Sequence, residues 1–180
     1  MGRSVLEGAF SLLDRLTDEG ELGLSQLADR CALPKTTVYR LLDQLESLGA
    51  VENVRGRYRV GAQMFRFGQA WEPAPGVLRA ARQPLRALSA TTRTSAIFAV
   101  PRHDRVLVAA ASIVRAEDVA RLRPGATVPA GVELVSAPVR APAGLVVGTV
   151  SAVLGHGRSA AVLEAAVGHA AKAVSAALVS

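Results

Sequence analysis

One stretch limits the possible folds of this chain more than any other: residues 33–49, LPKTTVYRLLDQLESLG. Its apolar side chains recur three and four residues apart, which predicts a helix with one apolar stripe. The stripe consists of Val38, Leu41, Leu42, Leu45 and Leu48. Pro34 suits the first helical position, where its missing N–H costs nothing, and Gly49 suits the left-handed position after the last turn.

The polar side of this helix is divided along its length. The first half carries hydrogen-bond donors, namely Lys35, Thr36, Thr37, Tyr39 and Arg40, whereas Asp43 and Glu46 lie in the second half. Free N–H groups and the helix dipole favour an anion at the N-terminal end. A recognition helix addresses DNA in this way. On this stretch alone, an ordinary amphipathic helix with a solvated polar side remains the alternative.

Two further helices are expected before it. Ser4 and Glu7 form the pattern of a capping box. The inward residues that follow are Val5, Leu6, Ala9, Leu12, Leu13 and Leu16, and this helix should end before Asp18. Ser25 should cap a shorter helix that runs to Cys31, and residues 32–34 form a turn. A short helix, a turn and a longer helix make a helix-turn-helix.

A basic hairpin is expected directly after Gly49. Residues 51–54 and 58–60 are strand-like, and Arg55-Gly56-Arg57 connects them. Arg55, Arg57 and Arg59 would make this hairpin a wing that reaches along the phosphate backbone. A solvated hairpin is the alternative.

The run LSQLADRCALPKTTVYRLLDQLESLGAVENVRGRYRVG resembles the IclR family of bacterial transcriptional regulators, over roughly residues 4–71. The resemblance implies a dimer or tetramer that binds a palindromic DNA operator, and a C-terminal GAF-like domain that senses small metabolites. It also implies DNA contacts at Lys35, Thr36, Thr37, Tyr39 and Arg40, with Ser25 at a phosphate.

We therefore expect an α+β protein of two domains. Residues 1–71 form a winged helix-turn-helix domain with a connecting helix over 62–71, and residues 72–76, EPAPG, form a linker because they cannot continue a helix. Residues 77–180 form a shortened, GAF-like effector-type or dimerisation domain. Its expected elements are a short helix opened by Pro84, strands over 95–100 and 105–113 around a turn at 101–104, and a hairpin of 133–139 and 145–154. A helix over about 159–179, with Val162 and Leu163 among its inward residues, closes the chain.

This second domain departs from the family between Gly125 and Gly131. The family has helices and a glycine-alanine turn there that supply part of the effector pocket. Thr149 and Ser151 are the remaining candidate effector-binding residues, and Phe98 is the only aromatic residue after Trp71. A ligand site needs a concave cavity with convergent polar groups. We therefore expect effector sensing to be lost or weakened, and this domain to serve chiefly in dimerisation.

The charge of the chain is distributed unevenly. The net charge is +6, yet residues 1–70 hold nine basic and nine acidic side chains, so the excess lies in residues 71–180. Net charge therefore does not establish DNA binding, and the evidence for it must come from the local arrangement of charged side chains. The basic residues of the second domain could attract an anionic metabolite or solvate the surface, and we favour solvation. They include Arg79, Arg82, Arg86, Arg115, Arg121 and Arg123.

Catalytic and metal-binding patterns are not expected. His103, His156 and His169 lack metal-ligand spacing, and Cys31 falls on the inner side of its helix. We expect no enzyme, no cofactor, no secretion signal and no membrane span, hence a cytoplasmic protein. The leading hypothesis is a sequence-specific regulator that binds its operator as a homodimer. The alternative is a protein-interaction paralogue that hetero-dimerises with a full-length regulator and modulates it.

Overall fold

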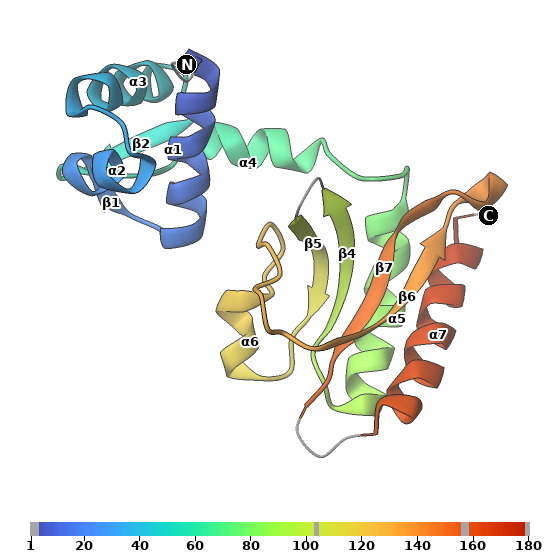
Figure 1. The fold of residues 1–180 in the computed structure, drawn as a ribbon. Helices are drawn as coiled ribbons and strands as arrows, with labels where there is room; N and C mark the ends of the chain where they lie inside the picture. The colour runs from blue at the N-terminus through green and yellow to red at the C-terminus, as the bar shows by residue number, and fades with distance from the viewer. Residues whose placement is uncertain (1–3, 103–104, 156–158, 179–180) are drawn as a thin grey trace. The chain divides into compact units, whose positions relative to one another are not determined.

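The computed structural model describes residues 4–102, 105–155 and 159–178. The chain divides into two compact units, residues 1–71 and 72–180 (Figure 1). The expected turn at His103-Asp104 and the loop around His156 lie outside the described residues.

The first unit packs three helices against a small antiparallel sheet of order β1-β3-β2. A further helix, α4, follows the sheet. The elements are α1 Val5–Glu19, β1 Leu22–Gly23, α2 Leu24–Cys31, α3 Lys35–Ser47, β2 Val51–Val54, β3 Arg57–Val60 and α4 Ala62–Gln69.

The core of this unit follows the predicted apolar stripes. Leu12, Leu27, Val38 and Leu42 are fully buried. The capping box of α1 is confirmed, since the Glu7 N–H donates to Ser4 Oγ at 3.2 Å and the Ser4 N–H donates to a Glu7 carboxylate oxygen at 2.8 Å.

Three apolar residues predicted to point inward are exposed instead. Val5 and Leu6 lie in the first turn of α1, before Gly8, which is the first residue of this helix to be buried. Leu48 is the C-cap of α3 and lies beyond its last buried residue, Leu45. The ends of both helices therefore extend past the layer that covers them.

Two helix starts also differ from the prediction. Pro34 is the N-cap of α3, in an extended conformation with ψ 139°, so the helix begins at Lys35. Ser25 is the second residue of α2 and does not cap it. Gly23 is the cap, and its N–H donates to Gln26 Oε1 at 3.0 Å. Pairing of β1 with β3 keeps Gly23 extended, so α2 can begin at the next residue.

The second unit is a four-stranded antiparallel sheet of order β5-β4-β7-β6, with α5 and α7 packed together along it (Figure 1). The α+β fold class predicted from the sequence is thus confirmed. The elements are α5 Val77–Thr92, β4 Ala96–Arg102, β5 Arg105–Ser112, α6 Ala116–Arg121, β6 Leu134–Arg140, a 3-10 turn Pro142–Gly144, β7 Val146–Val153 and α7 Ala160–Ala176.

A second apolar cluster lies on the sheet face opposite to Phe98, because neighbouring strand residues point to opposite faces. Ile97, Ala99, Val108 and Val153 contribute to it from the strands, and Leu122 covers them. Val128 and Val132 pack against the same cluster. The segment between Gly125 and Gly131, which lacks the helices of the family, thus brings Val128 to the sheet.

The helices of this unit correct three predictions. Pro84 does not open a helix but lies inside α5, which begins seven residues earlier at Val77. The six-residue helix α6 was not predicted. Val162, expected to point inward, is 70% exposed, because α7 buries its stripe only from Leu163 onward.

Candidate nucleic-acid interface

The recognition helix α3 packs its apolar side into the core and exposes its polar side, as predicted. Its apolar stripe is buried, whereas Lys35, Thr36, Thr37, Tyr39 and Arg40 are all exposed. Within the part of the chain that the structure describes, no hydrogen bond or ion pair engages the Lys35 ammonium or the Arg40 guanidinium. Both cations are therefore available to an external anion.

The two ends of α3 differ in electrostatic character. The N–H groups of its first three residues have no acceptor within the helix. At the other end Gly49 adopts φ 69°, and its N–H donates to the Glu46 carbonyl at 2.9 Å. Asp43 and Glu46 are exposed in this half. A phosphate is thus attracted to the start of α3 and repelled from its end.

Ser25 lies on the exposed side of α2, in its first turn. Because Gln26 serves the N-cap, the Ser25 hydroxyl is not used in capping. That leaves it able to donate to a phosphate, as the family resemblance implies.

The wing ends in a two-residue turn, Arg55-Gly56. Both residues have positive φ, 54° and 79°, which is the type I′ geometry that fits twisted hairpins. The Gly56 N–H donates to Asn53 Oδ1 at 3.0 Å and stabilises the turn. Arg55 is exposed at its tip and has no ion pair among the described residues. Arg55 is therefore the most available cation of the wing.

Arg57 and Arg59 are exposed, but both are bonded to other residues of the first unit. The Arg57 guanidinium donates to the Glu21 carbonyl at 2.5 Å. Arg59 donates to one Glu52 carboxylate oxygen at 3.0 and 3.1 Å and lies 3.6 Å from Glu21 Oε1. These bonds partly neutralise Arg59, so the three wing arginines are not equivalent.

Glu52 joins the wing to the next helix, a role that the sequence analysis missed. Its second oxygen accepts from the Ala62 N–H, the first of α4, at 3.3 Å. The hydrogen bond from Arg59 and the bond from Ala62 hold the pKa of Glu52 below its ordinary value. No periodicity marks this residue, because its partners meet only after β2 and β3 pair.

The structure brings the two candidate effector residues together. Ser151 is buried, and its hydroxyl lies 2.8 Å from Ser136 Oγ and 3.4 Å from Thr149 Oγ1. The three hydroxyls therefore satisfy one another across β6 and β7. A ligand here would have to compete with these bonds.

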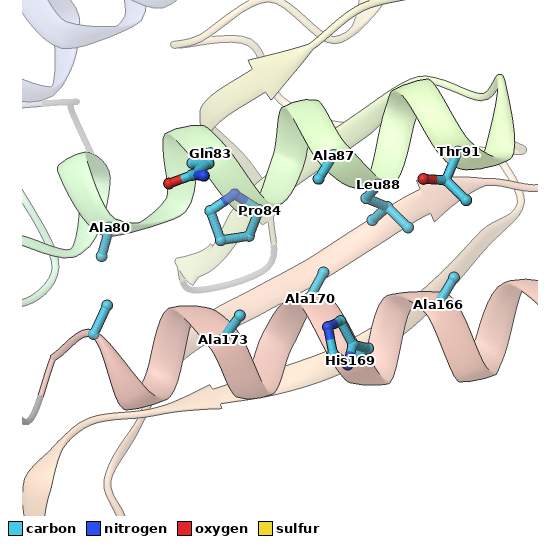
Figure 2. A pocket seen from close by; sticks show the side chains of 11 residues that line it. Ala80, Gln83, Pro84, Ala87, Leu88, Thr91, Ala166, His169, Ala170 and Ala173 are labelled. Atoms are coloured by element: carbon cyan, nitrogen blue, oxygen red, sulfur yellow. The ribbon is translucent and has the colours of Figure 1, made fainter.

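The second unit has a cavity elsewhere, between α5 and α7. It is a groove of about 630 Å³ lined mainly by alanines, with Pro84, Leu88 and His169 (Figure 2). Neither Thr149 nor Ser151 lines it. Among the described residues no three His, Cys, Asp or Glu side chains are grouped to hold a metal ion, and no helix has the length and apolarity to cross a bilayer.

Comparison with known proteins agrees with the geometry of the first unit. The IclR helix-turn-helix domain matches residues 5–55. The first unit thus carries a domain similar to the IclR helix-turn-helix. The chain is 36% identical over 92 residues to the HTH-type transcriptional regulator KdgR of Dickeya chrysanthemi, and 31% identical over 108 residues to BhcR of Paracoccus denitrificans.

These alignments cover 50% and 59% of the chain but only 30% and 39% of the two relatives. Solved structures extend the likeness of fold to nearly the whole chain. An IclR homologue from Microbacterium hydrocarbonoxydans, complexed with 4-hydroxybenzoate, has a TM-score of 0.78 at 16% identity and aligns over 97% of this chain and 99% of its own. A regulator from Alicyclobacillus acidocaldarius has a TM-score of 0.70 at 18% identity, over 99% and 100% of the two chains.

Proposed function

We propose that this chain is a sequence-specific DNA-binding transcriptional regulator that occupies a palindromic operator as a homodimer in the cytoplasm. One observation carries the proposal: an IclR helix-turn-helix domain presents the exposed Lys35 and Arg40 at the N-terminal half of its recognition helix. The relatives KdgR and BhcR, both HTH-type transcriptional regulators, support it.

Association through α4 would supply the homodimer. This helix buries none of its residues, and Phe65 and Phe67 are 71% and 55% exposed. Two exposed aromatic side chains on one short helix are typical of an association surface. The groove between α5 and α7 is the second candidate, in keeping with the dimerisation role predicted for residues 77–180.

We further propose that effector sensing is lost or weakened. The neighbour from Microbacterium hydrocarbonoxydans binds 4-hydroxybenzoate. In this chain Ser151 is buried and its hydroxyl is paired with Ser136, and Phe98, the single aromatic side chain of the second unit, is fully buried in the core. Calorimetry against small carboxylic and aromatic acids tests this, and a micromolar ligand that releases DNA would contradict it.

Selection of bound fragments from a random-sequence DNA pool, followed by measured affinities of Arg40→Ala, tests the main proposal. Arg40 can bond a guanine bidentately, and the loss of such a pair costs about 1–3 kcal/mol. We expect Arg40→Ala to weaken the selected site far more than random DNA. Gln44→Ala, an exposed change in the second half of α3, is the matched control and should weaken neither.

An equal loss on selected and random DNA would reduce Arg40 to a phosphate contact. A chain that enriches no sequence and yet forms complexes with an IclR-type regulator would support the alternative, the protein-interaction paralogue.

A further inference from the structure

Three arginines, Arg79, Arg82 and Arg86, lie on one side of α5, and we call them the arginine ridge. Their spacing of three and four residues places them in a row along the helix. All three are exposed. Within the described part of the chain, no ion pair or hydrogen bond engages their guanidinium groups.

The ridge is separate from the two packed sides of α5. Ala81 and Leu85 are buried, whereas Ala80, Pro84 and Ala87 line the groove toward α7 (Figure 2). At about 100° per residue, the ridge lies roughly a third of a turn from either set. It thus occupies the side of α5 left to solvent.

The strands packed against α5 bring no negative charge; the acidic residues next to this helix are Glu164 of α7 and Glu72, which accepts from the Gly76 N–H at 2.8 Å. The described residues of α5, β4 and β5 include no Asp or Glu, and β4 and β5 add Arg102 and Arg105. Ser89, on the flank of the ridge, lies 2.7 Å from Ser112 of β5, so this strand is the neighbour on that side.

Like charges three and four residues apart destabilise a helix. A solvated helix side commonly mixes both signs, whereas this one carries a single sign and so creates a positive potential. The surface is thus complementary to a polyanion rather than to a neutral partner.

We propose that the arginine ridge binds the phosphate backbone of double-stranded DNA without reading its sequence, so that the second unit adds to the affinity of the first. The inference rests on the proposed DNA-binding function. Seven residues of helix span about 10 Å, and phosphates of one strand follow every 3.4 Å or so along the duplex axis, so the ridge can meet about three of them. Guanidinium groups bond phosphate oxygens in pairs.

The covalent connection makes weak contacts effective. The segment 70–76 joins α4 to α5, and Arg79 follows it by three positions. A short linker holds a tethered site at an effective concentration in the millimolar range. Any duplex bound by the first unit is therefore presented to the ridge at a concentration that no free duplex would reach.

The test uses the full chain and a fluorescein-labelled random-sequence duplex of roughly 40 base pairs, with affinity measured between about 50 and 200 mM salt. The triple variant R79Q/R82Q/R86Q should reduce the slope of log K against log salt by about 2.7, or 0.9 per lost contact. At about 0.1 M salt the affinity should fall on the order of 10²-fold. The matched control R121Q/R140Q/K172Q removes the same charge from other exposed positions of the second unit and should change the slope by less than about one.

A second variant guards against loss of folding. R79K/R82K/R86K keeps the charges and should retain most of the slope. Equal slopes in the ridge variant and its control would overturn the proposal, because net charge alone would then explain the effect. An unchanged slope with loss of self-association would also overturn it and make the ridge an interface between copies.

Different results would contradict the ridge proposal and the proposed DNA-binding function. A chain that binds DNA and is weakened by Arg40→Ala but not by the ridge variant keeps the proposed function and loses the ridge. A chain that binds no duplex loses both.

Discussion

The first unit is balanced in charge, with nine basic and nine acidic residues, whereas the second has twelve basic and six acidic residues. Yet the match to a helix-turn-helix domain falls in the first unit, over residues 5–55. In the first unit charge is sorted by position, with cations at the start of α3 and carboxylates at its end. In the second unit positive charge is in excess, and the exposed side of α5 carries arginines only. Placement thus favours specificity, whereas excess favours affinity for any polyanion.

The two units also differ in how the backbone is packed at their tightest points. In the first unit a Cβ at Gly61 would overlap the Gly49 carbonyl oxygen and lie 3.0 Å from the Ala50 carbonyl carbon. In the second unit a Cβ at Gly148 would lie 2.6 Å from Phe98 Cζ and 2.7 Å from the Ala99 carbonyl oxygen. The contacts at Gly61 are with backbone alone, whereas those at Gly148 are with backbone and with the ring of the buried Phe98.

The largest effect should therefore come from Gly61→Ala, which we expect to cost about 3 kcal/mol of unfolding free energy because overpacking against backbone cannot relax. Gly148→Ala should cost about 1–3 kcal/mol, since its overlaps with the Ala99 carbonyl oxygen and the buried Phe98 ring are less close than the overlap at Gly61. Hydrogen exchange followed peptide by peptide should show faster exchange in residues 12–60 for the first variant and in the second unit for the other. Two variants that each loosen both units would show that the units do not fold separately.

Gly68→Ala is the control for Gly61→Ala. Gly68 lies in α4 with open space around its Cβ position, so this change should be neutral or stabilise the chain by up to about 1 kcal/mol.

Much of the first unit could be predicted because its signals are local. The Ser4–Glu7 box, the stripe through Val38 and Leu42, and the Arg55-Gly56 turn each depend on residues near in sequence. The spacing within α3 likewise sufficed to put Lys35 and Arg40 on one exposed side. The start of α2 was misplaced because the pairing of β1 with β3, distant in sequence, decides it.

The second unit was harder for a physical reason. Pro84 interrupts the hydrogen bonds of α5 without ending it, because packing on both sides of the proline holds the helix.

In the wing of the first unit, the bonds from Arg57 and Arg59 to Glu21 and Glu52 form between segments brought together by the sheet. No sequence pattern distinguishes these held arginines from Arg55.

The next effect in size decides which unit carries the proposed homodimer. Phe65→Ser with Phe67→Ser should raise the dimer dissociation constant on the order of 10²-fold, because buried aromatic side chains dominate interface energies. Ala87→Glu with Ala173→Glu, which places charge in the groove between α5 and α7, should leave it unchanged. Sedimentation velocity over a range of concentrations measures both. The opposite result would assign dimerisation to the second unit, as the sequence analysis expected.

A smaller effect should separate the arginines of the wing. If Arg55 meets a phosphate, Arg55→Ala should reduce the salt slope of DNA binding by about one unit on every sequence. Arg59→Ala should reduce it less, because Glu52 and Glu21 already offset that charge. Anisotropy titrations with a random-sequence duplex compare the two, and equal slopes for Arg55→Ala and the unaltered chain would remove the wing tip from the contacts.

The smallest effect concerns Glu52, whose carboxylate holds Arg59 and the first N–H of α4 together. Because the pKa of Glu52 is lowered in the folded chain, its contribution is complete above the ordinary value of 4.5 and is lost as the pH falls through the lowered pKa. Protonation should therefore loosen α4 from the wing only in acid, below pH 4.5. Carboxylate NMR should place the titration midpoint below that value, and Arg59→Gln should raise it, since the bond from Arg59 is the main cause of the shift. A midpoint that does not move in Arg59→Gln would show that Arg59 and Glu52 are not paired in solution.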